Sequence, residues 1–479
     1  MTGTGTVAAV DLGATSGRVM LGRVGPNELA VRTIARFANG AIEKQDGLYW
    51  DFENIWGSVC GGLASAFSAE SRLRGIGVDS WAVDYGLLCN ERLLQPPHHY
   101  RDPRNNAAVD IVHAEISADE LYRTSGLQHL PFNTIFQLVA DRLSGALDEA
   151  QGLLLIPDLI NYMLTGCQYA EQTNASTTGL LALDGANWNA DFIQRLSLQS
   201  ELFPDLIRAG EPVGGLLSNV AAILGASSHV TVTAVGSHDT SSAVVAVPSV
   251  ANDFAYISCG TWGLVGVELE SPILTKASEN ANFTNERGVD GRVRYLHNVM
   301  GLWLLSESMR KWQRTDVSIE LTTLISAAAA VTRSVAIFDV NDPVFLLPGD
   351  MPSRIAAWCR NHDQPVPRSK AELVRSIIES LSAAFVQAVQ DAAMLSGKRV
   401  SVIHIVGGGS QNALLCQRIA DRARMPVIAG PVEATAIGNV LVQARATGLA
   451  SGSLESLRAV VAQAVHVIAY QPSNFGPDQ

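Results

Sequence analysis

Two stretches of this chain place glycines and small hydroxyl side chains between runs of apolar residues. Residues 7–21 read VAAVDLGATSGRVML, and residues 255–267 read AYISCGTWGLVGV. Each stretch predicts a strand, a turn and a second strand, and such a turn presents backbone N–H groups and hydroxyls to phosphate oxygens. Two copies indicate a duplicated fold that grips one nucleotide from both sides. Neither copy has the Gly and Lys spacing of a P-loop.

The carboxylate of Asp11 comes at the end of the first predicted strand, directly before its turn. A carboxylate in that place can hold Mg²⁺ through water, because Mg²⁺ keeps much of its hydration shell. Alternatively, Asp11 only caps the turn, as Asp side chains often do. The second Gly-Thr turn and a triple glycine later in the chain favour the metal-binding interpretation.

A second carboxylate, Asp239, lies in the segment Ser-His-Asp-Thr at 237–240, after a β-branched run at 230–235. It could accept the proton of a substrate hydroxyl during phosphoryl transfer. Alternatively, Asp239 is only the N-cap of the helix predicted to begin there. Phosphoryl transfer needs little covalent chemistry from a protein, so one carboxylate, Mg²⁺ and donors around the phosphates would suffice.

Three further segments combine residue types that bind ligands. The triple glycine at 407–409 would let the backbone approach adenine or ribose, or is only a loose loop. Residues 78–85 mix aromatic rings with carboxylates, which suits a sugar, but their alternation also fits a plain strand. His98 and His99 have no ligand-spaced Cys or His beside them, so we interpret the pair as a surface loop rather than a metal site.

The composition excludes several classes of protein. The net charge of -12 leaves no basic stripe for nucleic acid. The six scattered cysteines form no CxxC pair, which predicts reduced thiols and a cytoplasmic protein. No basic segment precedes the first strand, and no apolar run reaches the roughly 18 residues of a membrane span. We therefore expect neither a signal peptide nor a membrane partner.

The elements that must position these residues follow from periodicity and from turn residues. The length of 479 residues favours two domains, and we place their boundary in the loop after Pro248. Residues 105–220 are expected to be mostly helical, with breaks at Pro131, Pro157 and Pro204. Strands are expected at 7–23, 29–37, 74–79 and 84–89, and a helix at 51–69.

The clearest helix is predicted over residues 370–396. Ser369 and Glu372 form a capping box, apolar residues repeat on one face, and Gly397 stops the helix. A strand at 400–406, the triple glycine, a helix to about Arg424, a strand at 426–430 and a last helix from Glu433 follow. This order predicts a doubly wound α/β fold, in which ligands bind at the carboxyl ends of the strands.

The chain resembles the FGGY family of sugar kinases from about residue 7 to residue 439. The resemblance implies an α/β fold with two actin/hexokinase-like, or ribonuclease H-like, ATPase domains that flank a cleft. It assigns 1–248 to an N-terminal domain for sugar and phosphate, and 249–479 to a C-terminal domain for the nucleotide. The motifs that carry it lie at 10–18, 79–84, 100–104, 131–134, 237–240, 260–262, 298–303, 404–409, 433–435 and 438–439.

The resemblance also implies roles for single residues. Asp239 would be the base that activates the primary 1-hydroxyl of the sugar, in addition to the Mg²⁺ already expected at Asp11. Closure of the two domains over the cleft would exclude water. The expected partners are a small-molecule sugar and ATP, and a monomer or a dimer both remain open. The sugar would be contacted by Ala82, His238, Asp239, Thr240 and Asn298, and the ATP site would be lined by Ala14, Thr15, Ser16, Gly17, Arg18, Thr261, Ser306 and Gly408.

Two of these motifs are more specific to one branch of the family and therefore indicate the substrate. The segments at 237–240 and 298–303 are most similar to the branch of the family that acts on L-rhamnulose. The expected reaction is therefore ATP-dependent phosphorylation of its 1-hydroxyl in L-rhamnose catabolism. The chain departs from the family at Ala82, usually Gly, at Ser306, often Gln, and at Arg287, usually Gly. It also lacks cysteines that some relatives carry near the last helices, so we expect no dependence on disulfides.

Two other functions stay open at this point. Because Ala82 adds a methyl group beside the expected sugar, the substrate could be another ketose, such as L-fuculose or a pentulose, or glycerol. A catalytically silent sugar or nucleotide sensor on the same scaffold is a second alternative. The presence of both Asp11 and Asp239 speaks against the sensor, which would not need a base.

Overall fold

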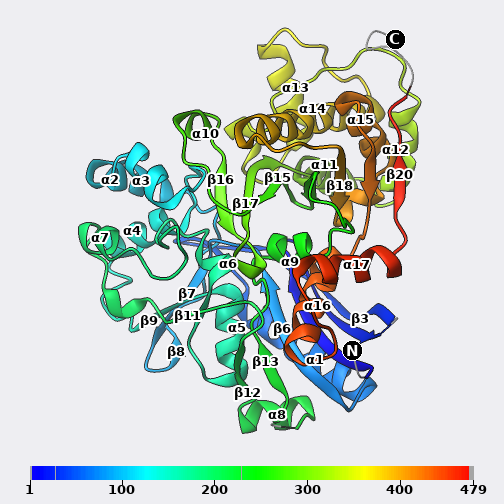
Figure 1. The fold of residues 1–479 in the computed structure, drawn as a ribbon. Helices are drawn as coiled ribbons and strands as arrows, with labels where there is room; N and C mark the ends of the chain where they lie inside the picture. Colours follow the sequence, from blue (N-terminus) through cyan, green and yellow to red (C-terminus); the bar gives the residue numbers. More distant parts are fainter. Residues whose placement is uncertain (1–2, 27, 228, 474–479) are drawn as a thin grey trace. The chain divides into compact units, whose positions relative to one another are not determined.

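The computed structural model describes residues 3–26, 28–227 and 229–473, and Figure 1 shows its ribbon. The chain divides into two compact units. The first unit runs to Val250 and also takes in Glu268–Tyr295 and Ala434–Val465. The second takes in Ala251–Val267, Leu296–Glu433 and the chain from His466 on. Segments of the two units alternate along the sequence, so these units do not test a single boundary between two domains. The domain boundary at 248/249 therefore stays a prediction.

The first unit is built on a mixed sheet of six strands. β1 pairs antiparallel with β2, and β2 pairs antiparallel with β3. On its other side β1 pairs parallel with β6, β6 pairs parallel with β13, and β13 pairs antiparallel with β12. In spatial order the strands are β12 (Pro212–Gly215), β13 (Thr231–Thr233), β6 (Leu73–Ser80), β1 (Gly5–Leu12), β2 (Ser16–Gly25) and β3 (Glu28–Ala38).

A second sheet repeats this pattern of pairing. β14 pairs antiparallel with β15 and parallel with β18, β18 pairs parallel with β19, and β19 pairs antiparallel with β20. These strands correspond in turn to β1, β2, β6, β13 and β12, so the expectation of a duplicated α/β fold is confirmed. In spatial order the strands are β16 (Thr284–Arg287), β17 (Val293–Met300), β15 (Trp262–Leu269), β14 (Phe254–Cys259), β18 (Val402–Val406), β19 (Val427–Ala429) and β20 (Ile468–Tyr470).

Helices cover both faces of the six-stranded sheet. α1 (Phe52–Ala69) packs Gly62 onto Val19 of β2, where a Cβ on the glycine would lie 2.5 Å from the valine. α16 (Ala434–Ala446) packs Val440 onto Gly22 of β2, where a Cβ on the glycine would lie 2.3 Å from the valine. Val19 and Gly22 are three residues apart in one strand and therefore point to opposite faces. The two helices sandwich the sheet between them.

The expectation of mostly helical structure over 105–220 is right for its first half and wrong for much of the second. Four helices occur up to Thr165, but the chain from 176 to 217 contains short strands, turns and only brief helices. Pro157 does not break a helix, because it lies in the first turn of α5, where its missing N–H has no partner to lose. The helices are α2 (Asn105–Glu115), α3 (Ala118–Ser125), α4 (Thr134–Ser144), α5 (Ile156–Thr165), α6 (Gln172–Ala175) and α7 (Ala190–Arg195).

The prediction for residues 370–396 is confirmed. α14 spans Lys370–Ser396, the Ser369 hydroxyl accepts from the backbone N–H of Glu372, and Gly397 ends the helix with a φ of 67°. α15 (Ala413–Ala423) follows the triple glycine as expected. The helix from Glu433, however, is not the last one, because α17 (Leu454–Ala464) and β20 come after it.

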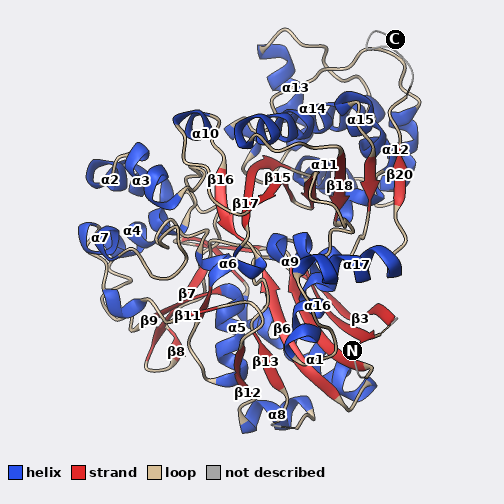
Figure 2. Cartoon of the chain, viewed as in Figure 1, coloured by secondary structure: helices blue, strands red, loops and turns tan. Residues whose placement is uncertain are grey.

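Figure 2 separates helices, strands and loops by colour. Among the described residues, none of the helices combines the length and the apolar character that a membrane span requires. The remaining elements are β4 (Ala41–Lys44), β5 (Gly47–Trp50), β7 (Tyr85–Cys89), β8 (Arg92–Leu93), β9 (Gly152–Leu155), β10 (Ala170–Glu171), β11 (Leu206–Ile207), α8 (Ser218–Leu224), α9 (Asp239–Val245), α10 (Lys276–Asn280), α11 (Trp303–Gln313), α12 (Leu321–Ala329) and α13 (Met351–Asn361), with short 3-10 turns at Ser200–Leu202, Val289–Gly291, Pro343–Phe345 and Gly408–Gln411.

Candidate functional site

The turn between β1 and β2 has the open backbone expected of a phosphate cradle. The N–H of Gly13 donates to the carbonyl of Ser16 at 2.9 Å, which closes the turn. Asn39 braces it from outside, donating from its side chain to the Gly13 carbonyl at 2.8 Å and from its backbone to the Thr15 carbonyl at 3.1 Å. Thr15 is exposed and Ala14 is partly exposed, so the tip of the turn is accessible to a ligand.

Three charged residues form a row across adjacent strands at the end of β1. Asp11 of β1 is the pairing partner of Arg18 on β2 and of Asp79 on β6. The Nη2 of Arg18 donates to Oδ2 of Asp11 at 2.6 Å. Residues opposite one another on neighbouring strands project from the same face of a sheet, so the row gathers its charge at one place. Asp79 was not singled out in the sequence, where only its mixed aromatic and acidic segment gave a signal.

Asp79 is fully buried, and among the described residues only one of its two carboxylate oxygens accepts a side-chain hydrogen bond. The Nδ2 of Asn439, on α16, donates to Oδ2 of Asp79 at 2.6 Å. Oδ1 is buried and has no hydrogen-bond partner within the described part of the chain. Burial, and then the charge of Asp11, raise the pKa of Asp79 well above its usual value. A cation beside these two carboxylates would relieve both effects.

This arrangement fits Mg²⁺. Oδ1 of Asp79 lacks a hydrogen-bond partner among the described residues, and carboxylates are ligands that Mg²⁺ prefers. No cluster of three or more His, Cys, Asp or Glu side chains suited to a metal occurs among the described residues. Asp11 and Asp79 supply two carboxylates, and Mg²⁺ sites commonly use one or two carboxylates and take their other ligands from water and substrate phosphates.

Asp239 is the first residue of α9 and does not cap it. The position before the helix is occupied by His238, so the interpretation of Asp239 as a mere N-cap is wrong. The Asp239 side chain is 30% exposed, and its Oδ1 accepts from the Thr240 hydroxyl at 3.1 Å. His238 forms an isolated parallel bridge with Ser80 at the end of β6. The carboxylate therefore stands near the Asp11–Asp79 row, and its charge contributes to the raised pKa of Asp79.

The loop before Asp239 is anchored by a buried carboxylate. Oε2 of Glu171, at the end of β10, accepts from the backbone N–H of Ser237 at 3.0 Å and from its hydroxyl at 2.8 Å. Glu171 is fully buried, and burial raises its pKa even though these donors oppose the rise. Sequence reasoning missed Glu171, because nothing near it in the chain signals a partner at residue 237.

α9 itself is held in place by a close backbone approach. A Cβ on Gly438 of α16 would lie 1.8 Å from the carbonyl oxygen of Ser242, so no other residue fits there without displacing a helix. At the far end of α9, Arg458 donates to the Val244 carbonyl and forms a buried ion pair with Glu268, with both contacts to the carboxylate at 2.8 Å. These contacts fix the helix that carries Asp239.

The segment after β6 is not a plain strand. β6 ends at Ser80, and the chain turns at Val83, which adopts a φ of 69° that a β-branched residue rarely takes. The Thr134 hydroxyl donates to the Val83 carbonyl at 2.7 Å and stabilises the turn. Ala82 is partly exposed within it, as a sugar contact would need to be.

Asp84 is buried under this turn and receives four hydrogen bonds. The indole N–H groups of Trp50 and Trp81 donate to its Oδ2 at 2.6 and 3.0 Å, and the backbone N–H of Tyr100 donates at 3.2 Å. Gln137 donates to Oδ1 at 2.9 Å. Burial raises the pKa of Asp84 to about 6, and the donors limit the rise. The aromatic and acidic residues of this segment therefore form a rigid support behind Ala82.

The interpretation of His98 and His99 as a surface loop is wrong for His99. Its ring is buried, lies 4.2 Å from the ring of Trp50, and stacks on Tyr100 with centroids 4.5 Å apart. Burial, and then the charge of Arg101, lower the pKa of His99 to about 3. His99 is thus a neutral core residue.

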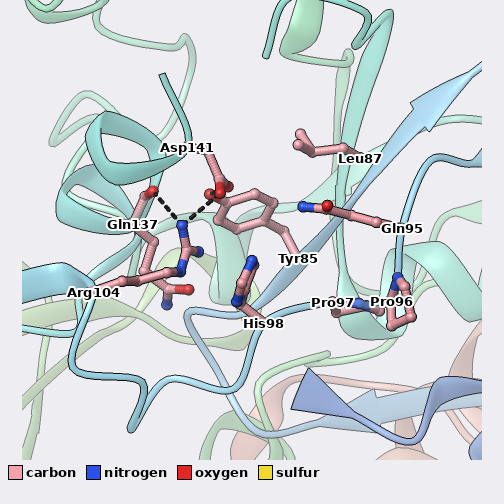
Figure 3. Close-up of a pocket in the computed structure, with 9 residues that line it drawn as sticks. All are labelled: Tyr85, Leu87, Gln95, Pro96, Pro97, His98, Arg104, Gln137 and Asp141. Carbon is pink, nitrogen blue, oxygen red and sulfur yellow. Dashed lines mark hydrogen bonds and ion pairs between the residues drawn. The ribbon is translucent and has the colours of Figure 1, made fainter. Parts of the chain in front are cut away.

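A small polar pocket lies beside the same support (Figure 3). Asp141 binds Arg104 at 2.5 Å and also accepts from the hydroxyl of Tyr85. Gln137 links the pocket to Asp84. The close-up shows the guanidinium of Arg104 pointing toward the carboxylate of Asp141, with the ring of Tyr85 beside them. The pocket is lined by Tyr85, Leu87, Gln95, Pro96, Pro97, His98, Arg104, Gln137 and Asp141.

The second unit gathers the expected nucleotide residues at the end of β14. Thr261 lies in the turn between β14 and β15, where the Gly260 N–H donates to the Trp262 carbonyl at 2.8 Å. The Gly260 carbonyl accepts from the N–H of Leu302 at 2.9 Å, which attaches the start of α11 to this turn. Ser306 is exposed on the first turn of α11. Asn298, which was expected to contact the sugar rather than the nucleotide, is partly exposed on β17.

The triple glycine is not a loose loop. It leads into a 3-10 turn, and a Cβ on Gly409 would lie 2.2 Å from Sγ of Cys259 at the end of β14. Gly407 has a φ of 80°, which favours glycine. Gly408, in contrast, is exposed, with nothing within 4 Å of the place of a Cβ. Its backbone is open to a ligand.

Comparisons with known proteins agree with this architecture. Residues 6–246 match the N-terminal domain, and residues 255–447 the C-terminal domain, of the FGGY family of carbohydrate kinases. A rhamnulokinase of Bacteroides thetaiotaomicron is 38% identical over 470 residues, covering 98% of this chain and 96% of that protein. A rhamnulokinase of Pectobacterium carotovorum is 41% identical over 447 residues, covering 92% of this chain and 88% of that protein.

Solved structures are similar in fold at much lower identity. A ligand-bound xylulose kinase from Lactobacillus acidophilus superposes with a TM-score of 0.77 at 18% identity, covering 98% of this chain and 94% of that one. A glycerol kinase from Plasmodium falciparum with ADP gives a TM-score of 0.75 at 13% identity, covering 98% and 95%. These likenesses establish the two-domain α/β kinase fold.

Proposed function

The chain belongs to the FGGY family of carbohydrate kinases, and we propose that it transfers the γ-phosphoryl group of ATP to the 1-hydroxyl of L-rhamnulose. The choice of substrate rests on the similarity to rhamnulokinases, which are 37–41% identical over at least nine-tenths of the chain. The proposed place of this reaction is the breakdown of L-rhamnose, in the cytoplasm, by a monomer or a dimer.

Asp239 is the proposed base. As the sugar O1 attacks the γ-phosphorus, its proton passes to the Asp239 carboxylate, and the bond to the leaving oxygen of ADP breaks. The partial exposure of the carboxylate and its place at the start of α9 support this role. Thr240 donates to Oδ1 and thereby limits rotation of the carboxylate.

Phosphate binding is proposed for the turn Ala14, Thr15, Ser16, Gly17, with Arg18 behind it. The exposed tip of the turn supports this assignment. Asp11 and Asp79 are proposed to hold Mg²⁺ largely through water, and the bound ion would supply positive charge to the phosphates. Oδ1 of Asp79, which has no hydrogen-bond partner in the described part of the chain, supports the site.

The nucleotide is proposed to contact Thr261, Ser306 and Gly408, and the open space above Gly408 supports that contact. Ala82, His238, Thr240 and Asn298 are proposed as sugar contacts. The second candidate function is a kinase for another ketose, such as L-fuculose or a pentulose, because the methyl group of Ala82 changes the surface expected to contact the sugar. A non-catalytic sensor is disfavoured, because Asp11, Asp79 and Asp239 lie near one another around a place that suits a metal and phosphate.

The test is ADP formation with Mg-ATP and a panel of ketoses. We expect turnover with L-rhamnulose, and a loss of roughly 10²–10⁴-fold in kcat for Asp239→Asn, because that substitution removes the base and keeps the shape. Turnover only with another ketose would replace the substrate and keep the base. Absence of sugar-stimulated turnover with every ketose would contradict the proposed function.

A further inference from the structure

A buried ionic network lies on the side of His238 away from Asp239. Its members come from three separate places in the sequence: His238 before α9, Glu286 on β16 and Arg294 on β17, all within the first unit. Arg294 is 0% exposed, and the side chains of Glu286 and His238 are 4% and 6% exposed. Arg294 and then His238 hold the pKa of Glu286 below its usual value in spite of its burial.

Each nitrogen of the Arg294 guanidinium lies beside a different partner. Nε donates to the Arg287 carbonyl at 3.0 Å, Nη1 forms an ion pair with Oε2 of Glu286 at 3.0 Å, and Nη2 lies 3.1 Å from Nδ1 of His238. A guanidinium can only donate, so in the last contact Nδ1 of His238 must accept. A neutral imidazole that accepts at Nδ1 carries its proton on Nε2.

The same result follows if His238 is charged. Oε2 of Glu286 lies 3.2 Å from Nδ1 of His238, an ion-pair distance that is favourable when Nδ1 carries a proton. In the imidazolium both ring nitrogens carry protons, so Nε2 is again a donor. Nε2 lies 3.4 Å from Oδ1 of Asp239. Either way, a proton on Nε2 faces the carboxylate of Asp239.

We propose that Glu286 and Arg294 are positioning residues that act through His238 on the base Asp239; this inference rests on the proposed function. Together they keep a proton on Nε2 of His238, which lies 3.4 Å from Oδ1 of Asp239, while the Thr240 hydroxyl donates to that same oxygen. Among the residues that the structure describes, both contacts are to Oδ1. Oδ2 is therefore the oxygen that accepts the sugar proton.

The alternative is that the network only stabilises the fold, as buried ion pairs can. The two roles differ in what they predict for folded protein. A structural role lowers the melting temperature and leaves kcat of the folded fraction unchanged. A positioning role lowers kcat even where the variant is fully folded, because a small misplacement of a reacting group reduces the rate strongly.

The first test measures the tautomer of His238 in the wild-type chain, without substrate. ¹⁵N chemical shifts of the ten histidine rings report which ring nitrogens carry protons, and loss of one signal set in His238→Gln assigns this residue. We expect Nε2 to be protonated. A bare Nε2 would overturn the proposal. Because this readout needs no turnover, it stands even if the proposed substrate is wrong.

The second test uses kinetics of Glu286→Gln and Arg294→Lys. We expect kcat to fall roughly tenfold or more, while KM for sugar and for ATP stays within about twofold of wild type. Arg445→Lys is the matched control, since Arg445 makes a comparable pair with Asp290 at the surface of the same unit, and it should keep wild-type kcat. Folded variants with unchanged kcat would overturn the proposal.

A third comparison isolates His238 and remains informative if the network variants fail to fold. Gln can place an N–H near the position of Nε2, whereas Asn reaches only the position of Nδ1. We expect His238→Gln to keep a kcat roughly tenfold above that of His238→Asn. In the His238→Asn background, Glu286→Gln should reduce kcat no further, because the intermediary is gone. Equal kcat values for His238→Gln and His238→Asn would contradict the proposal. Fully additive effects of His238→Asn and Glu286→Gln on kcat would contradict it as well.

Discussion

Asp11 and Asp79 are direct pairing partners on the parallel strands β1 and β6, and Asp79 has a buried oxygen without a hydrogen-bond partner among the described residues. Two carboxylates side by side, one of them fully buried, are unfavourable unless a proton or a cation compensates them. Arg18 already compensates Asp11, so the buried carboxylate of Asp79 is the group that a further positive charge would stabilise.

Replacement of Asp79 by Asn should abolish stabilisation by metal without unfolding the protein. The substitution removes a buried charge beside Asp11, so the melting temperature without metal should stay close to wild type. A ligand that binds only the folded state raises the melting temperature. We expect Mg²⁺ with ADP to raise it for wild type and for a surface control, Asp391→Asn, and to have little effect on Asp79→Asn. An equal rise in all three would rule out Asp79 as a contributor to the site.

Gly438→Ala should destabilise the first unit strongly. Its Cβ would lie 1.8 Å from the backbone carbonyl of Ser242, and neither helix can yield without moving α9 and Asp239. Overpacking of this kind destabilises by about 1–3 kcal/mol or more, and kcat should fall as well. The measurement is urea unfolding together with ADP formation by the folded fraction.

The matched control for that substitution is Gly57→Ala in α1. Gly57 is exposed within a helix, and nothing lies within 4 Å of the place of its Cβ. Alanine favours the helix there, so we expect a gain of about 0.5–1 kcal/mol and unchanged kcat. If both alanine variants had wild-type stability, the close packing of α16 on α9 would be refuted.

The stability of the protein should depend on pH through Asp84. Burial raises the pKa of this carboxyl to about 6 in the folded state. A raised folded-state pKa stabilises the fold fully below the unfolded value near 4, and this contribution is lost as pH rises toward 6. Asp84 alone should therefore lower the free energy of unfolding by roughly 2 kcal/mol between pH 4 and pH 7.

Asp84→Asn isolates that contribution, because the amide does not titrate and its oxygen can still accept from Trp50 and Trp81. The free energy of unfolding, measured in urea at a series of pH values, should fall less steeply from pH 4 to pH 7 in the variant. Other buried carboxyls with raised pKa values, such as Glu171, contribute equally to both proteins and cancel in the difference. Parallel curves would mean that Asp84 does not change its protonation in this range.

Neighbouring glycines of the triple-glycine segment should respond differently to alanine. Gly408→Ala meets open space, so the fold should be kept, and a role in nucleotide binding would appear as an increase in KM for ATP alone. Gly409→Ala would drive a methyl group into Cys259 and should lower the melting temperature by several degrees. Thermal unfolding and ATP-dependence of the rate separate the two effects; unchanged KM in Gly408→Ala would remove Gly408 from the nucleotide site.

Much of the local structure could be predicted from the residues themselves. The capping box at Ser369 and the stop at Gly397 bound α14 correctly, because both signals act within a few residues of the helix ends. The two strand-turn-strand stretches were recognisable for the same reason, since apolar strands and small turn residues are local features. Residues 176–217 were predicted poorly, because short turns there depend on packing rather than on periodicity.

The sequence by itself was enough to propose which residues carry the chemistry, because Asp11, Asp239 and the glycine-rich turns are recognisable by residue type and position. Only the tertiary structure decided their neighbours. Asp79 beside Asp11, and Glu286 and Arg294 behind His238, result from strand register and from contacts across long sequence separations. Such pairings arise when distant segments bury their apolar faces together, and no periodicity within a single segment records them.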